Sequence, residues 1–417
     1  MKRVFMMVLI CTTLFLSATQ PVLAEEERIS ISVDSLPVFF EVAPVTDQGR
    51  TLVPFRAIAE ALNVTVDWDG TTRSIHAGGL GTTVQLQIGS SLASVNGMPV
   101  TLDVPPQIIN GRTLIPLRFF SEAFHCQVEW VAAAREVRII SPPSDLHVTG
   151  FYALGDSRTS SWTNLFGVQY PETAPGNTDV VDELAFGWYS MDADGNLLLN
   201  SGTGWQRPSG WETMLEAAHQ YDLSTEMVVH LTDGTGAITS ILASDQAMGT
   251  AVSAMSEEAG LYDGVNLNFE GLGLSESGEA LIAVQENFTH FVQLLSTELK
   301  SHHKTLTLTV HAPNSAYRGY DYEALGKASD KMIIMAYDYG PKPEPISQVM
   351  QAVEMALEQV SSEKVLLGIS APYETAESVV AKMGIAKRYS LKGVALWRLG
   401  LVPPDMWDTM RVHAVPE

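Results

Sequence analysis

The second half of the chain alternates short apolar runs with longer amphipathic stretches. The runs have the length of strands, and the stretches between them carry apolar residues at helical spacing. The candidate strands are His147–Leu154, Glu183–Ser190, Thr225–Leu231, Gly264–Glu270, Thr305–His311, Lys331–Tyr337, Lys364–Ser370 and Lys392–Trp397. The candidate helices are Trp211–Tyr221, Asp245–Glu258, Leu281–Lys300, Pro345–Val360 and Ala376–Arg388. Because eight strands alternating with helices fit a barrel of about 250 residues, we predict an α/β fold, a (β/α)8 TIM barrel, over residues 146–417.

The chain ahead of this barrel contains an internal repeat. The sequence GRTLVPFR at residues 49–56 returns as GRTLIPLR at residues 111–118, and Glu60 and Trp68 return as Glu122 and Trp130. Each copy predicts a short strand, a helix of about eight to ten residues, and a strand that ends at the Trp. We therefore predict a small α+β repeat domain over residues 30–141, followed by a short linker at residues 141–145.

The N-terminus has the pattern of an export signal. Lys2 and Arg3 precede an apolar run over Val4–Leu16, and small residues lead up to Ala24. We expect residues 1–24 to be a Sec signal peptide cleaved after Ala24, which predicts a secreted or cell-wall-associated protein. No later run approaches the length of about 18 apolar residues that a membrane span needs.

Charge and cysteine content narrow the classes of partner. The formal net charge is −23, and cleavage of the signal removes two further positive charges. Such a surface repels nucleic acid and anionic lipid and favours neutral substrates. The mature chain keeps only Cys126, so it forms no intrachain disulfide. The soft ligands of the repeat domain, His76, His125 and Cys126, lack metal-site spacing, so we expect no metal and no cofactor.

The candidate strand Gly264–Glu270 alternates strictly between two kinds of residue. One face carries Val265, Leu267 and Phe269, and the other carries Gly264 and then, in a row, Asn266, Asn268 and Glu270. A row of polar side chains is costly inside a barrel unless the residues are partnered or functional. A carboxylate that ends a strand at the mouth of a parallel barrel is placed for catalysis.

This strand resembles the D-G-x-D-x-D-x-E motif of glycoside hydrolase family 18, the chitinases and related N-acetylglucosaminidases. Asp263, Gly264 and Glu270 match the motif, whereas Asn266 and Asn268 replace its two middle aspartates. The sequence from Met335 to Tyr339 resembles the family's M-x-Y-D-[WY] motif, and Trp397 ends the last strand where the family has an aromatic residue. The three motifs in this order favour the family. Asn in place of the second motif residue, Phe269 ahead of Glu270, and Glu-Gly-Leu at residues 270–272 resemble its spore-cortex and cell-wall branch. The repeat domain resembles the copper amine oxidase N-terminal-like stalk domain.

The resemblance implies a role for each matching residue. Glu270 would protonate the leaving oxygen while the substrate's own N-acetyl group attacks the anomeric carbon. Asn268 would hydrogen-bond the acetamido group, and Tyr337 would donate its hydroxyl to the same group. Asp338 would bind a sugar hydroxyl, Trp397 would stack on the sugar, and Met335 and Tyr152 would line the site. Asp263 is expected to be structural, with Gly264 and Asn266 completing the motif. His311 could equally line the cleft or lie in the core.

Two functions follow from these residues. The first is a secreted glycosidase that cleaves β-1,4-linked N-acetylglucosamine glycans, either peptidoglycan and cortex fragments or chitooligosaccharides. The second is a catalytically weak or inactive glycan-binding homologue at the cell wall, since Asn268 carries no charge. Residues 30–141 are expected to act as a spacer or to associate with the wall.

Overall fold

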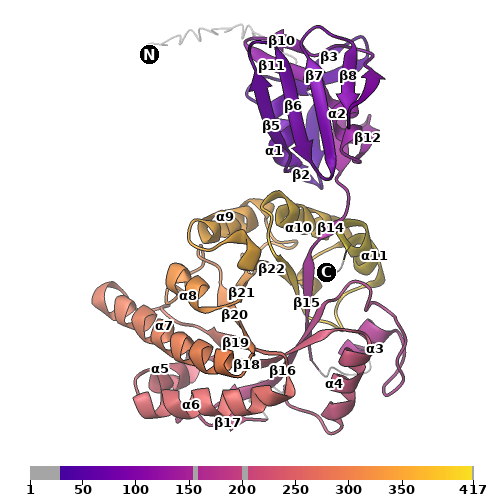
Figure 1. Cartoon of the computed structure of the whole chain (residues 1–417). Helices are drawn as coiled ribbons and strands as arrows, with labels where there is room; N and C mark the ends of the chain where they lie inside the picture. The colour runs from indigo at the N-terminus through magenta and orange to yellow at the C-terminus, as the bar shows by residue number, and fades with distance from the viewer. Residues whose placement is uncertain (1–28, 154–157, 200–204, 416–417) are drawn as a thin grey trace, which may run out of the picture.

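The computed structural model describes residues 29–153, 158–199 and 205–415, so the predicted signal peptide lies outside the described residues. Within them, parallel strands close into a barrel, because β15 pairs with both β23 and β16 (Figure 1). The barrel strands are β15 (His147–Tyr152), β16 (Glu183–Met191), β18 (Ser224–Thr232), β19 (Gly264–Glu270), β20 (Thr305–His311), β21 (Lys331–Met335), β22 (Val365–Ser370) and β23 (Gly393–Trp397). The predicted TIM barrel is confirmed.

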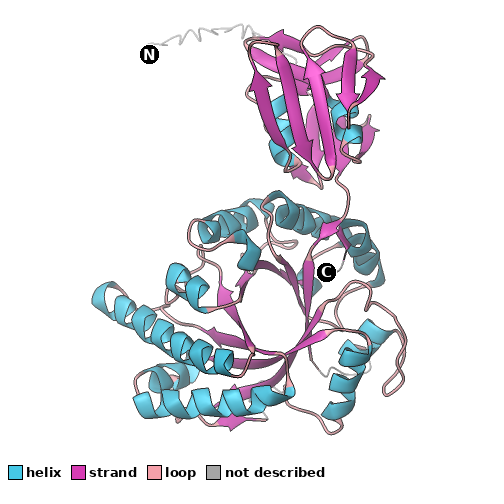
Figure 2. Ribbon diagram, in the orientation of Figure 1, coloured by secondary structure: helices cyan, strands magenta, loops and turns pink. Residues whose placement is uncertain are grey.

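Helices surround the barrel, as Figure 2 shows. They are α3 (Ser161–Phe166), α4 (Trp211–Gln220), α5 (Ala237–Leu242), α6 (Asp245–Glu258), α7 (Gly278–Ser301), α8 (Tyr322–Ala328), α9 (Ile346–Leu357), α10 (Ala376–Arg388) and α11 (Pro404–His413). Three short strands lie outside the barrel ring. β17 (Leu197–Leu198) pairs with β16, and β14 (Ser144–Asp145) pairs with β24 (Ala414–Val415). Helices α3, α5, α8 and α11 are absent from the sequence prediction, and the first three of them have only six or seven residues.

The repeat domain is built from strands and two short helices. Its elements are β1 (Ser30–Val33), β2 (Leu36–Pro37), β3 (Val45–Asp47), β4 (Arg50–Pro54), α1 (Phe55–Ala61), β5 (Thr65–Asp69), β6 (Ser74–Gly79), β7 (Thr82–Gln87), β8 (Leu92–Val95), β9 (Met98–Thr101), β10 (Gln107–Ile109), β11 (Arg112–Pro116), α2 (Leu117–Ala123), β12 (Gln127–Val131) and β13 (Glu136–Ile140). Each repeat helix has seven residues, shorter than predicted. The repeated blocks pair with each other, since β4 and β11 run antiparallel with Val53 opposite Ile115.

A buried polar cluster joins the two domains. Asp34 of the repeat domain is 2% exposed and accepts hydrogen bonds from the backbone N–H (2.9 Å) and the hydroxyl (2.5 Å) of Ser141. From the barrel side, Lys387 Nζ and His413 Nδ1 each lie 3.7 Å from an Asp34 carboxylate oxygen. Burial, and then the charge of Lys387, lower the pKa of His413 to about 4. The segment at Ser141, predicted as a linker, therefore begins inside a packed junction.

Removal of the Asp34 carboxylate should destabilise the full-length protein. Asp34→Ala leaves Lys387 as a buried charge whose remaining acceptors are neutral oxygens and the imidazole of His413. We expect the free energy of unfolding to fall by about 3 kcal/mol, which chemical denaturation would measure. Asp34→Asn is the matched variant, since it keeps an acceptor for Ser141 and should lose less. Equal stability of Asp34→Ala and wild type would show that the junction contributes nothing.

Candidate active site

The fourth barrel strand, β19, places its polar row inside the barrel. Val265, Leu267 and Phe269 are fully buried against the surrounding helices, and the opposite face turns Asn266, Asn268 and Glu270 inward. At the start of the strand, the Asp263 carboxylate accepts hydrogen bonds from the backbone N–H and the hydroxyl of Thr225, both at 2.9 Å. Gly264 is required by close packing, because a Cβ there would lie 2.1 Å from Thr305 Oγ1.

Asn266 belongs to a polar network deep in the barrel. Its Nδ2 donates to Glu226 Oε2 (3.1 Å), and its Oδ1 accepts from the Thr309 hydroxyl (2.8 Å). Lys331 binds both Glu226 and Glu183, which connects three strands beneath the site. Burial, and then the charge of Glu183, raise the pKa of Glu226 to about 7. Asn266 therefore has a structural explanation that requires no substrate.

Asn268 differs from Asn266 because it has no such partner. The residue is 1% exposed, and within the described part of the chain neither its amide nitrogen nor its amide oxygen makes a hydrogen bond of good geometry. A buried amide that lacks both partners is costly unless a ligand completes it. The unsatisfied atoms lie between the network below and Glu270 above, on the inner face of β19.

Glu270 ends β19 at the mouth of the barrel and lies next to a histidine. Its Oε1 is 3.5 Å from Nε2 of His230 on β18, and the two side chains are 23% and 19% exposed. Burial alone would raise the pKa of Glu270, but the hydrogen bond and charge of His230 and the charge of His311 outweigh burial, so the pKa is lowered. A general acid is effective while it is protonated, which favours a raised pKa for a carboxyl in this role. In the free protein that requirement is not met.

The motif at the end of β21 lies near Glu270. Burial raises the pKa of the Tyr337 hydroxyl, and the charges of Glu270 and Asp338 raise it further. Met335 is paired in register with His311, so it belongs to the inner face. The Asp338 side chain is exposed and lies 3.6 Å from Lys342 Nζ.

The strand prediction for β21 ran two residues too far. The strand ends at Met335, and Asp338 adopts a left-handed backbone with φ 66°. The buried carboxylate of Glu344 accepts hydrogen bonds from the backbone N–H groups of Asp338 (3.0 Å) and Tyr339 (3.1 Å). Glu344 thus holds the turn that carries Tyr337 and Asp338.

Trp397 lies at the end of β23 and contacts two other aromatic rings. Its ring meets Phe151 edge-on, with centroids 5.2 Å apart, and stacks on Trp205 at 4.9 Å and 14°. Trp205 reaches this position across Gly187, where a Cβ would lie only 2.2 Å from the indole. Trp205 therefore covers one face of the Trp397 ring, which was predicted to stack on a sugar.

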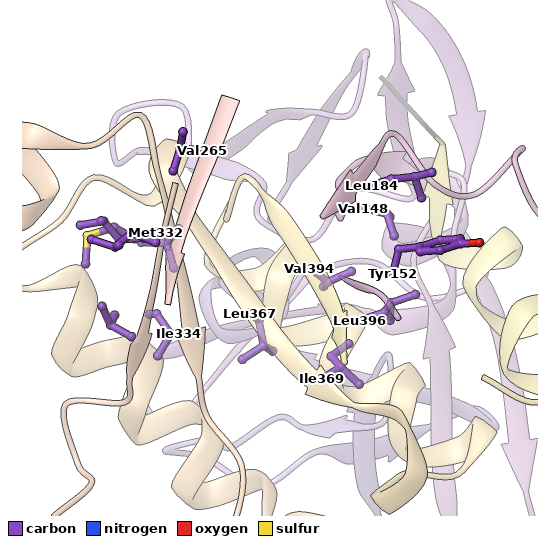
Figure 3. Close-up of a cluster of buried hydrophobic side chains, with 14 of the residues drawn as sticks. Val148, Tyr152, Leu184, Val265, Met332, Ile334, Leu367, Ile369, Val394 and Leu396 are labelled. Atoms are coloured by element: carbon purple, nitrogen blue, oxygen red, sulfur yellow. The ribbon is translucent and has the colours of Figure 1, made fainter. Parts of the chain in front are cut away.

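Tyr152 does not line the mouth of the barrel. Its ring packs against Phe186 and Trp188 in the layer between strands and helices, and Figure 3 shows it beside Val148 and Leu184. Neighbouring side chains of a strand point to opposite faces, so Phe151 is the residue of β15 that points inward, next to Trp397. The prediction for Tyr152 is wrong by one residue.

A cavity of about 400 Å³ opens beside Glu270. It is bordered by the loop after β18, the loop after β19, His311 and Tyr317, and the two rings stack at 3.9 Å and 19°. Of the two alternatives for His311, this placement favours the cleft. A larger cavity, of about 650 Å³, lies in the repeat domain and includes Arg118 and Trp130.

Several residues of the site were missed by sequence reasoning. Glu226 and His230 share the inward face of β18 with Val228 and alternate with Met227, Val229 and Leu231, as the polar residues of β19 alternate with its apolar ones. That pattern was visible in the sequence and could have revealed both residues. Trp205 carried no such signal, because its contact with Trp397 joins positions far apart in the chain.

Metal and membrane signals are absent from the described residues. No group of three His, Cys, Asp or Glu side chains among them is arranged to hold a metal ion. None of the helices within residues 29–153, 158–199 and 205–415 has both the length and the hydropathy for a membrane crossing.

Comparisons with known proteins match both halves of the chain. Residues 32–139 match the copper amine oxidase N-terminal domain, and residues 203–372 match glycosyl hydrolases family 18. The structure resembles a chitinase from Chromobacterium violaceum, with a TM-score of 0.53 and 20% identity over 64% of this chain and 98% of the other. It also resembles the spore cortex-lytic enzyme SleL of Bacillus megaterium, with a TM-score of 0.54 and 16% identity over 76% and 80% of the two chains. At these identities the two structures show a shared fold.

Curated relatives cover less of the chain. The "Putative sporulation-specific glycosylase YdhD" of Bacillus subtilis is 31% identical over 118 residues, which is 26% of each chain. A protease inhibitor from Brevibacillus choshinensis is 26% identical over 122 residues, 29% of this chain and 36% of the inhibitor. The matches thus span about a quarter to a third of the length of these relatives. Together with the barrel and the motif residues at its mouth, the family matches show that the chain contains a glycosyl hydrolase family 18 domain preceded by a copper amine oxidase N-terminal domain.

Proposed function

We propose that the protein is a glycosidase that hydrolyses β-1,4-linked N-acetylglucosamine glycans. The observation that carries the proposal is the placement of Glu270 and Asn268 on one inward face. The Asn268 amide makes no hydrogen bond of good geometry among the described residues, and Glu270 borders a cavity of about 400 Å³. An acid and an amide in this order suit a substrate whose N-acetyl group serves as its own nucleophile. The negative charge of the chain favours neutral glycan segments over polyanions.

In the proposed reaction each residue has one task. The amide of Asn268 hydrogen-bonds the acetamido group and holds its oxygen under the anomeric carbon. Tyr337 donates its hydroxyl to the same group, and Glu270 delivers a proton to the leaving glycosidic oxygen. A water then opens the oxazolinium from the side of the departed sugar, which retains the anomeric configuration.

The aromatic residues and Asp338 are proposed to bind the sugars. Trp397 and Trp205 form an aromatic wall on the side of β15, β16 and β23, and sugar rings stack on such surfaces. Asp338 is exposed at the turn that Glu344 holds, where a sugar hydroxyl could replace Lys342 as its partner. Met335 lies on the inner face of β21, in register with His311 of β20.

The substrate is proposed to be peptidoglycan or cortex fragments or chitooligosaccharides, with the repeat domain in contact with the wall. SleL, whose fold this barrel shares, is described as a spore cortex-lytic enzyme. The repeat domain offers a cavity of about 650 Å³ in which Trp130 and the guanidinium groups of Arg50 and Arg118 are accessible. We further propose that residues 1–24 direct export.

A second candidate is a glycan-binding protein without turnover. Two observations favour it: Asn268 supplies no negative charge for the oxazolinium, and the pKa of Glu270 is lowered, which works against its role as an acid. Incubation with chitooligosaccharides and with muropeptide fragments, followed by mass spectrometry and binding calorimetry, separates the two functions. Hydrolysis products support the glycosidase. Binding without products supports the second candidate. The absence of both products and binding would exclude both functions for these glycans.

A further inference from the structure

A histidine occupies the place beside Glu270 where it can exchange a proton with the carboxylate. His230 lies on β18 and is in register with Asn268 of β19, two residues before Glu270. Its Nε2 is 3.5 Å from Glu270 Oε1, and both side chains are mostly buried at the mouth of the barrel. The imidazole is thus the titratable neighbour of the carboxylate at a position where Asn268 contributes no charge.

We propose that His230 and Glu270 act as a dyad, in which His230 holds the proton that Glu270 delivers to the glycosidic oxygen. The proposal rests on the proposed function. In the first step the Nε2–H bond breaks as an O–H bond forms on Glu270. That O–H bond then breaks as the leaving oxygen takes the proton, the C1–O bond breaks, and the acetamido oxygen bonds to C1.

The second half of the reaction restores the dyad. Glu270 is then a carboxylate and His230 a neutral imidazole. The carboxylate takes a proton from the water that attacks C1, the bond between C1 and the acetamido oxygen breaks, and the proton returns to His230 Nε2. No atom or charge is gained or lost over the cycle.

The electrostatics of the site require a proton source of this kind. The hydrogen bond and charge of His230, with the charge of His311, lower the pKa of Glu270 despite its burial. A lowered pKa makes the carboxyl lose its proton more readily, and an ionised acid cannot protonate a leaving group. Imidazole is the side chain whose charge changes between pH 5 and 8, so it can carry the proton over that range.

The other groups around the pair do not take this role. His311 on β20 stacks on Tyr317, and burial lowers its pKa even though Glu270 and Asp338 oppose that change, so it holds a proton less readily than an exposed histidine. Burial raises the pKa of Tyr337. The remaining acidic groups near the cavity are Asp233 after β18 and Glu276 after β19, together with Asp338 after β21.

The test is a pH–rate profile of His230→Gln beside wild type on one chitooligosaccharide. Without the proton reservoir, activity should depend on Glu270 alone, so the basic limb should move to lower pH by about one unit or more. If His230 only lowers the pKa of Glu270, its loss should move the basic limb to higher pH instead. Either that shift or an unmoved limb would overturn the proposal. His302→Gln is the control, since His302 forms an exposed pair with Glu298 (3.4 Å) away from the mouth.

A second readout needs no turnover. The imidazole resonances of His230, followed by NMR in wild type and Glu270→Gln, should change over a lower pH range in the variant, because the carboxylate that stabilises the imidazolium is gone. Identical titrations would show that no proton is shared. If the two titrations differ but the protein hydrolyses no glycan, the proton sharing between His230 and Glu270 stands and the proposed function is rejected.

Discussion

Replacement of Glu270 by Gln should reduce hydrolysis of N-acetylglucosamine oligosaccharides by about 10²- to 10⁴-fold, the usual contribution of a general acid. The amide keeps the size and shape of the carboxyl at the end of β19 but has no proton to deliver. Binding should stay within a few-fold of wild type, since Asn268, Tyr337 and the aromatic wall are untouched. Single-turnover rates and calorimetry on the same oligosaccharide separate the two effects.

The matched control is Glu279→Gln, which changes an exposed carboxylate in the first turn of α7. Its rate should be indistinguishable from that of wild type. A Glu270→Gln protein that hydrolyses at nearly the wild-type rate would show that another group is the acid. Loss of binding together with turnover would point instead to a damaged site, and the NMR spectrum of the variant would reveal it.

The barrel was predictable because the residues that flank its strands mark where each strand begins and ends. Gly264–Glu270 and Thr305–His311 are found as predicted, since each is a strand-length run flanked by residues that break the pattern. Helix α10 also matches, and Thr375 at its N-terminus forms a capping box with Ser378. Periodicity and end signals act within a few residues, which is the range that a sequence displays directly.

What the sequence could not supply were contacts between distant segments. Three such contacts depend on how strands and loops meet at the barrel mouth. They are the Glu270–His230 pair, the stacking of Trp205 on Trp397, and the hydrogen bonds from the turn after β21 to Glu344. The Asp34 junction is a further case, because it joins the first strand pair of the chain to α10 and α11. The Ser141 segment was predicted as a linker from its prolines alone, which carry no information about such a partner.

The same distinction explains the two asparagines of β19. The sequence predicted a role at the substrate for Asn268 and only a place in the motif for Asn266. In the structure Asn266 donates to Glu226 and accepts from Thr309, whereas Asn268 makes no hydrogen bond of good geometry among the described residues and interacts only with Glu270. Only Asn268 therefore bears on substrate, and a charge introduced at the two positions should have different consequences.

Asn268→Asp should raise turnover of N-acetylated oligosaccharides by about tenfold and move the basic limb of the pH–rate profile upward by about one unit. A carboxylate at residue 268 raises the pKa of Glu270 by like-charge repulsion, opposing the lowering by His230 and His311. A general acid with a raised pKa stays protonated to higher pH, so the rate falls later on the basic side. The new charge also stabilises the oxazolinium, and substrates without an acetamido group should gain little.

Asn266→Asp provides the matched comparison for this last prediction. It places the same charge deeper on the same strand face, against the Glu226 carboxylate that Asn266 now contacts at 3.1 Å. Like charges at that distance should lower the free energy of unfolding without any gain in turnover. Profiles of wild type and both variants on one chitooligosaccharide decide the matter. An Asn268→Asp protein that is slower than wild type, with its basic limb unmoved, would mean that the neutral amide is itself adapted to the reaction and that charge at residue 268 is not what limits it.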